Sequence, residues 1–201
     1  MRMPRLLASV TLMGLLVACS TSPSNEYYRL TANVAGSPSG ESPSLGIGPI
    51  AIPAYLDRER LVYALDGNQV QLARSALWAE PLDSGIERVL ALNLATRLDT
   101  QNVRTFPWHP KRAPDYGVKL TVLTMDANKT EAQLTVEWLV YRPAGSAPVE
   151  RRISRLRTPT PAGAEMPTQL PAVFSEMLDE LSAEIAEVIR AHAASGTPED
   201  T

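Results

Sequence analysis

The segment "AQLTVEWLVYR" (132–142) decides the fold class, because apolar and polar side chains alternate along it. Leu134 and Trp138 lie on one side of an extended chain, together with the valine that follows each of them two positions later. Thr135 and Glu137 lie on the other side. A period of two over this length predicts a β-strand that buries one face and exposes the other.

Strands of the same kind are expected beside this one. "YGVKLTVLTM" (116–125) alternates in the same way, and "VERRISRLRT" (149–158) is expected to pair with 132–142. The arginines of 149–158 lie partly on an outer face, and we interpret them as solvated side chains opposite acidic neighbours rather than as an anion site. Shorter strands are predicted at 26–31, 44–52, 60–65, 69–73 and 102–106.

Turn residues and a proline add detail to the prediction of the shorter strands. Asp66, Gly67 and Asn68 favour a tight turn, so 60–65 and 69–73 are expected to form a hairpin. Pro49 has no backbone N–H to donate to a neighbouring strand. The segment 44–52 is therefore expected to be an edge strand or to bulge at Pro49.

In two further segments the apolar period is three to four residues, which predicts helices. In "EPLDSGIERVLALNLATRLDT" (80–100), the helix begins either at a capping box of Ser84 and Glu87 or near Pro81. In "PTQLPAVFSEMLDELSAEIAEVIRAHA" (167–193), apolar residues form one stripe and acidic residues cover the other face. The pattern predicts an α+β fold, a mostly antiparallel sheet with two main helices packed on one face.

The only cysteine, Cys19, ends an apolar run that follows two arginines, which is the order of an export signal. The run is shorter than the ~20 residues that a membrane-spanning helix needs. Leu16, Val17, Ala18 and Cys19 resemble the bacterial lipobox, in which the cysteine carries diacylglycerol and an N-acyl chain and becomes the new N-terminus. The alternatives are a cysteine buried in a hydrophobic helix and an ordinary cleaved signal peptide.

The composition of the chain indicates a single domain with shorter segments before and after it. We assign 1–18 to a lipoprotein signal peptide, 19–25 to a lipidated tether and 26–194 to a single α+β domain. The segment 33–44, rich in Gly, Ser and Pro, is predicted to be a flexible loop, and 195–201 a flexible tail. The formal net charge is −3, and no basic patch in the sequence indicates that the protein binds nucleic acid.

No motif of catalysis or metal binding is present in the sequence. A nucleophile elbow, a P-loop, a G-x-G-x-x-G turn and a metal-spaced pair of ligands are all missing. His109 lies in the Pro-rich "FPWHPKRAP" and is expected to be exposed, and His192 is expected in the last turn of the final helix. We therefore predict no catalytic residue, no metal and no cofactor, and a protein that is not an enzyme.

Several stretches carry a family resemblance. "EYYRL" (26–30), "GIGPIAIPAYLDRERLVY" (46–63) and "ALWAEPLDSGIERVLALNLATRL" (76–98) resemble the PqiC-type auxiliary lipoproteins of ABC-type lipid-transport systems. "PDYGVKLTVLTMDANKTEAQLTVEWLVYR" (114–142) is similar to the same family. The resemblance implies a non-enzymatic component of a machine that moves lipids between Gram-negative membranes.

The resemblance also implies a place and partners. Ser20, rather than Asp, follows the lipobox cysteine, which implies sorting to the outer membrane with the domain facing the periplasm. The implied partner is an MCE-domain protein, which forms the periplasmic conduit that the lipoprotein docks. A ring of identical subunits is implied as a further arrangement.

Aromatic and proline residues are the candidate contacts to that partner, because large aromatic side chains anchor interfaces. Tyr55 and Trp78 have an alternative role as caps of the sheet core, whereas Trp108 is expected to be more exposed. Two other functions stay open: a structural lipoprotein of another envelope assembly or secretion machine, and a lipid carrier or lipid hydrolase that works alone. The candidate contacts are Pro49, Pro53, Tyr55, Trp78, Pro81 and Trp108.

Overall fold

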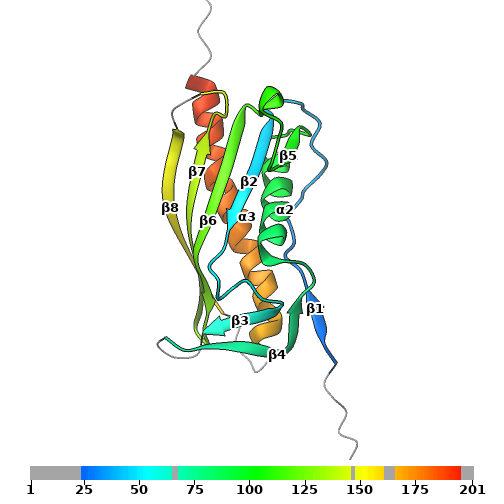
Figure 1. Ribbon diagram of the computed structural model, residues 1–201, viewed down its shortest axis with the longest axis vertical. Helices are drawn as coiled ribbons and strands as arrows, with labels where there is room; N and C mark the ends of the chain where they lie inside the picture. The colour runs from blue at the N-terminus through cyan, green and yellow to red at the C-terminus, as the bar shows by residue number, and fades with distance from the viewer. Residues whose placement is uncertain (1–23, 65–67, 146–147, 161–165, 196–201) are drawn as a thin grey trace, which may run out of the picture.

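A five-stranded sheet is the framework of the domain (Figure 1). The computed structural model describes residues 24–64, 68–145, 148–160 and 166–195. The strand order is β5-β2-β6-β7-β8. The strands are β2 (Leu45–Ala51), β5 (Val103–Thr105), β6 (Tyr116–Ala127), β7 (Glu131–Tyr141) and β8 (Pro148–Pro159).

The sheet combines antiparallel and parallel pairs. β6, β7 and β8 form an antiparallel meander in which Val136 lies opposite Val122, and Leu134 opposite Leu156. β2 runs parallel to both β5 and β6. The ladder between β2 and β6 shifts its register between Ile47 and Ile50, so the predicted bulge at Pro49 is confirmed.

The alternative for β2, an edge strand, is wrong, because β2 lies between β5 and β6. The short β5 pairs only with Leu45 to Ile47 of β2. Pro49 therefore lies beyond the part of β2 that has a neighbour on the β5 side, where a missing N–H breaks no ladder bond.

Two helices cover one face of this sheet, α2 (Leu82–Arg97) and α3 (Met166–Ser195). The alternating residues Leu134, Val136, Trp138 and Val140 are fully buried beneath them. Phe174, Leu181 and Ile185 of α3 close the core from the other side. The predicted α+β fold with two main helices is confirmed.

The predicted capping box at the start of α2 is wrong. The helix begins at Leu82, directly after Pro81, and this N-cap residue makes no side-chain capping hydrogen bond. Ser84 and Glu87 therefore lie inside the helix, and the N–H of Ser84 bonds to the Asp83 carboxylate at 2.8 Å.

A second, three-stranded sheet closes one end of the molecule (Figure 1). β3 (Arg60–Ala64) and β4 (Val70–Trp78) pair antiparallel, as predicted for this hairpin, whereas Asp66 and Gly67 of the predicted turn lie outside the described residues. The first strand, β1 (Glu26–Tyr28), pairs in parallel with the other end of β4. The chain enters the domain at this end, and α3 finishes at the opposite end, near the short helix η1 (Pro110–Arg112).

Several predicted features lie outside the described residues: the signal peptide, the lipobox with Cys19, and residues 196–201 of the tail. The segment 33–44 is described, and it is irregular apart from a bridge between Gly40 and Thr100. The N–H of Ser39 in this segment donates to the Asp99 carboxylate at 2.7 Å. Neither described helix is both long and apolar enough to cross a membrane.

Candidate interaction site

A groove of about 460 Å³ lies where β1, the loop before β3, the end of β4 and the start of α2 meet. These segments lie far apart in the sequence, and the second sheet brings them together. Its lining includes Tyr27, Asp57, Arg58, Glu59, Trp78, Glu80 and Pro81.

Main-chain hydrogen bonds at the end of β4 fix the walls of the groove. The N–H of Trp78 donates to the Glu59 carbonyl at 2.6 Å, which ties β4 to the loop before β3. The N–H of Ala79 donates to the Tyr28 carbonyl at 2.7 Å, which ties the same point to β1. Trp78 is thereby held between two segments whose side chains line the groove.

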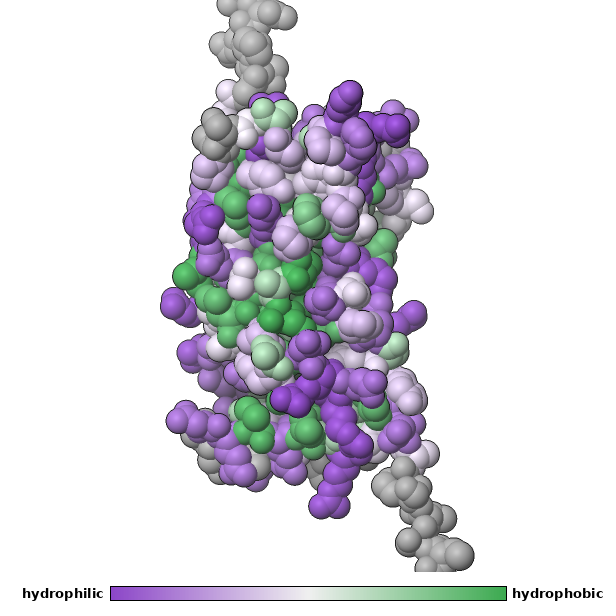
Figure 2. Space-filling view, viewed as in Figure 1, coloured by the Kyte–Doolittle hydropathy of each residue, from purple (hydrophilic) through white to green (hydrophobic). Residues whose placement is uncertain are grey.

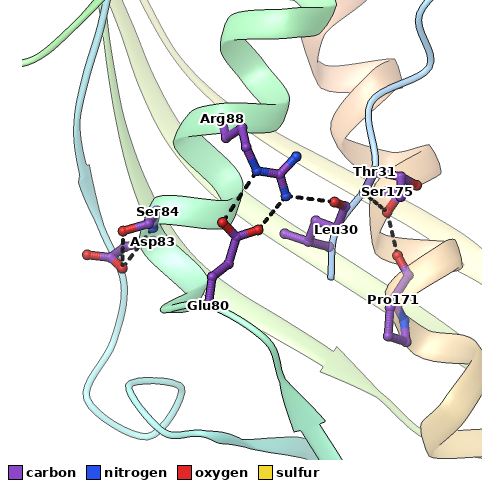
Figure 3. A network of polar contacts seen from close by, with 8 residues as sticks. All are labelled: Leu30, Thr31, Glu80, Asp83, Ser84, Arg88, Pro171 and Ser175. Atoms are coloured by element: carbon purple, nitrogen blue, oxygen red, sulfur yellow. Dashed lines mark hydrogen bonds and ion pairs between the residues drawn. The ribbon is translucent and has the colours of Figure 1, made fainter. Parts of the chain in front are cut away.

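A polar cluster fastens the start of α2 beside the groove (Figure 3). Glu80 forms an ion pair with Arg88 of α2. The same guanidinium group donates to the Leu30 carbonyl at 2.9 Å. The N–H of the next residue, Thr31, donates to Ser175 Oγ of α3 at 3.0 Å. The segment after β1 is therefore anchored to both helices.

The chemistry of the groove is that of a contact surface. Tyr27 is 66% exposed, and the half-buried Trp78 lines the groove together with the exposed Pro81. Asp57, Arg58 and Glu59 are exposed at the rim. Within the part of the chain that the structure describes, no three His, Cys, Asp or Glu side chains gather in a way that could hold a metal ion. Aromatic rings within a polar rim are typical of protein interfaces.

The structure distributes the candidate contact residues over several places. Trp78 and Pro81 line the groove. Pro49 is exposed at the bulge of β2. Pro53 is half-buried, and its carbonyl accepts from the Leu56 N–H at 2.9 Å in the loop before β3.

Tyr55 has the geometry of the alternative role, a cap on the core. It is half-buried and packs against the core. Its hydroxyl donates to Asp126 Oδ1 at 3.1 Å and lies 3.3 Å from the N–H of Met125. Burial raises the pKa of Tyr55 to about 12, so the ring stays neutral. These bonds join the loop before β3 to β6.

Trp108 lies at the opposite end of the domain and is half-buried rather than exposed. It packs edge-on against Phe106 with 5.4 Å between ring centres. A Cβ on Gly46 would lie 2.6 Å from the Trp108 ring, so the indole covers the bare backbone of β2. Phe106, at 48% exposure, is the accessible aromatic residue there.

The two histidines have structural partners. Nδ1 of the exposed His109 accepts from the Lys111 N–H at 3.1 Å and caps η1. Nδ1 of His192, in the last turn of α3, lies 3.0 Å from the Tyr116 hydroxyl.

The open face of the five-stranded sheet is a second exposed surface. Figure 2 shows apolar side chains gathered in the middle of this face. Among the residues that point outward there, Leu123 is 40% exposed and Ile153 is 49% exposed. Arg151 pairs with Glu137, and Arg157 pairs with Glu131. For Arg151 and Arg157, the interpretation of the β8 arginines as solvated residues opposite acidic neighbours is confirmed.

Of the groove residues, sequence reasoning named only Trp78 and Pro81, and it missed the exposed Tyr27 and the charged side chains of Asp57, Arg58, Glu59 and Glu80. Successive side chains of a strand point to opposite faces, and Tyr28 packs against the core. Its neighbour Tyr27 therefore points away from the core. The run "DRER" between two strands is a signal for a charged rim, but no local pattern indicates that β1 lies beside it.

Comparison with solved structures shows the fold. One crystal structure of an uncharacterized protein matches with a TM-score of 0.68 and 23% identity, over 83% of this chain and 99% of the other. The crystal structure of a protein from Xanthomonas campestris matches with a TM-score of 0.69 and 16% identity, over 86% of this chain and 99% of the other. Among curated proteins, no sequence matches the chain.

Comparison with family models is more specific. The model of the ABC-type transport auxiliary lipoprotein component matches residues 28–186. The match extends from Tyr28, the last residue of β1, well into α3, and it includes the five-stranded sheet, the β3–β4 hairpin and all of the groove lining except Tyr27. The chain belongs to the family of ABC-type transport auxiliary lipoprotein components.

Proposed function

We propose that the protein is a lipoprotein of the outer membrane that faces the periplasm and docks the conduit of an ABC-type system for lipid transport between membranes. Its direct partner is an MCE-domain protein, and it acts by binding, with no enzymatic activity and no cofactor. The observation that carries this proposal is the family match over residues 28–186. The groove supports it, because aromatic side chains within a polar rim suit a protein partner.

In this proposal Cys19 is the anchor and carries diacylglycerol and an N-acyl chain. Leu16, Val17 and Ala18 precede it as the lipobox. Anchoring confines the domain to a thin layer above the bilayer, where even a weak contact becomes sufficient because the local concentration is high. A ring of identical subunits around the conduit would multiply that contact in the same way.

Substitution of the anchor tests its chemistry. We expect Cys19→Ser to lose palmitate incorporation and signal processing in growing cells, because the serine hydroxyl does not replace the thiol as the acceptor of the diacylglyceryl group. Ser20→Ala is the matched control and should incorporate palmitate normally. Labelling that persists in Cys19→Ser would refute the assignment of the anchor.

Crosslinking in intact cells tests the partner. A photo-reactive benzoylphenylalanine is placed at Trp78 or Pro81 in the groove, and at Leu92 on the outer face of α2 as the control, since Leu92 is 41% exposed. We expect an MCE-domain protein as the main adduct from the groove positions only. Adducts with secretion or outer-membrane assembly components alone, without an MCE-domain protein, would contradict the transport role and favour the alternative.

A further inference from the structure

The end of the domain that carries β1 is the end closest to the membrane anchor. Ser24 is the first described residue, and the five peptide steps from Cys19 to Ser24 span at most ~18 Å when fully extended. The domain is longer than this tether, because the 12 residues of β6 alone extend roughly 40 Å. β1 and the end of β4 that pairs with it are therefore held near the bilayer, and the β3–β4 hairpin extends from that point.

The hairpin of β3 and β4 has an apolar face at this end. Val62 lies opposite Leu72, and Ala64 lies opposite Val70, so four apolar side chains share one face of the hairpin. Val62 is buried, but Leu72 is 43% exposed and Val70 is 49% exposed. Two adjacent aliphatic side chains on a solvent-facing strand indicate a surface that something else covers.

Two arginines border this apolar face. Arg74 follows Leu72 by two residues on β4, so it projects from the same face, and it is exposed. Arg60, at the start of β3, is also exposed, and its guanidinium donates to the Ala73 carbonyl at 3.0 Å, which holds the charge against β4. Aliphatic groups beside guanidinium groups match the boundary between lipid acyl chains and phosphates.

We propose that the β3–β4 hairpin rests on the surface of the bilayer that holds the anchor. Val70 and Leu72 enter the headgroup region, and Arg60 and Arg74 lie at the lipid phosphates. The proposal rests on the membrane anchor of the proposed function, but it does not depend on which protein is the transport partner. Because the tether keeps the hairpin close to lipid, a small apolar contact is sufficient. The groove lies at the same end of the domain as the hairpin, so in this arrangement it is close to the membrane.

A single-cysteine experiment tests this contact in the full, acylated chain. Leu72→Cys and Leu92→Cys variants are labelled with bimane and placed in vesicles of phosphatidylethanolamine and phosphatidylglycerol that contain lipid spin-labelled near the headgroup. Leu92 on α2 is the matched control, because it is also a leucine and is 41% exposed against 43% for Leu72. Val70→Cys and Phe106→Cys, at 49% and 48% exposure, form a second matched pair from opposite ends. The chain without an added cysteine must take up no label, since the diacylglyceryl group blocks the Cys19 thiol.

We expect the spin-labelled lipid to quench the label at Leu72 at least about threefold more strongly than the label at Leu92, because side chains at this boundary lie within ~5–10 Å of the headgroups. The pair Val70 and Phe106 should differ in the same direction. Equal quenching within both pairs, in protein that floats with the vesicles, overturns the proposal and leaves the anchor intact. Protein that does not float overturns both. Shielding of the Leu72 label that follows protein concentration and not spin-labelled lipid assigns the face to a second copy of the chain and also overturns the proposal.

Discussion

The two sheets place their tryptophans in different surroundings. Trp138 of β7 is fully buried under the helices, and its Nε1 donates to Ser154 Oγ at 2.9 Å. Trp78, at the end of β4 in the three-stranded sheet, is only half-buried and lines the groove. One indole completes a core, whereas the other covers the edge of a core and remains accessible.

This difference separates stability from binding. The five-stranded sheet and its helices bury most of the large apolar side chains, including Leu134, Phe174 and Ile185. The three-stranded sheet adds fewer of them, such as Leu61 and Val62, and leaves Val70 and Leu72 partly in solvent. Substitutions in the first region should therefore act on the free energy of unfolding, and substitutions in the second should act mainly on contacts.

The largest expected effect is that of Trp138→Ala. Loss of a fully buried indole should lower the free energy of unfolding by about 3–5 kcal/mol, because it leaves a cavity under α3. Trp78→Ala should cost roughly 1–2 kcal/mol, since its ring is only partly withdrawn from water. Urea denaturation of the soluble domain that begins at Ser24, followed by circular dichroism, measures both. We expect that domain to fold without lipid. An equal loss of unfolding free energy in the two variants would contradict the distinction between the two sheets.

Ion pairs offer a smaller and sharper contrast. Glu80 and Arg88 are about a third exposed, and Arg88 also bonds the Leu30 carbonyl. Glu80→Gln should cost about 1 kcal/mol, because a partly buried guanidinium keeps only one of its partners. Glu137→Gln, which removes the partner of Arg151 on the open sheet face, should cost at most about 0.5 kcal/mol, since Arg151 is 62% exposed.

Urea denaturation of the two variants side by side measures this contrast. Groove crosslinking from Trp78 should also decrease in Glu80→Gln, because the start of α2 loses its fastening, and it should stay unchanged in Glu137→Gln. A greater loss of stability in Glu137→Gln than in Glu80→Gln would mean that the open face of the large sheet is the more constrained surface.

The sequence predicts the large sheet better than the small one for a physical reason. β6, β7 and β8 bury one face only, so their side chains alternate and the period is visible. The sequence predicts a strand that ends at Ala73, but β4 continues to Trp78. Ala76 and Leu77 are both buried, and two consecutive buried residues interrupt the period of two.

The groove could be predicted only in part, because it depends on the parallel pairing of β1 with β4. Tyr27 lies opposite Leu77, fifty positions away in the sequence, and no local pattern records such a contact. Trp108 shows the reverse case. Its Pro-rich loop is typical of exposed residues, but Gly46 leaves a hollow on β2 that the indole fills. Composition predicted the loop and could not predict what the loop covers.

Two aspartates at opposite ends of β6 extend the contrast to pH dependence. Asp115, just before β6, accepts from the hydroxyl of Ser44 at 2.7 Å and from its N–H at 2.8 Å. These hydrogen bonds lower the pKa of Asp115 below its usual value. Asp126, near the end of β6 beside the small sheet, is half-buried, and burial raises its pKa although the Tyr55 hydroxyl opposes the shift.

The two shifts act on stability with opposite signs. A lowered pKa means that the folded state binds fewer protons, so the contribution of Asp115 is present above the ordinary aspartate pKa of about 4 and is lost as the pH falls through the lowered value. A raised pKa means that the folded state binds more protons. Asp126 therefore makes the fold more stable as the pH falls from neutral through its raised pKa toward about 4.

The smallest expected effects are therefore changes of slope. Asp115→Asn should lower stability at about pH 7 and reduce the loss that the parent domain shows between about pH 5 and about pH 3. Asp126→Asn should abolish part of the gain between about pH 7 and about pH 4 and should leave the loss below it unchanged. Urea denaturation at a series of pH values measures both slopes.

The two variants should also differ in crosslinking from Trp78. The Ser44 bonds join β2 to β6 far from the groove, whereas the Tyr55 bond joins β6 to the loop that leads into the groove, so only Asp126→Asn should alter this crosslinking. A groove that responds to Asp115→Asn instead would mean that the two ends of the molecule are coupled through β6.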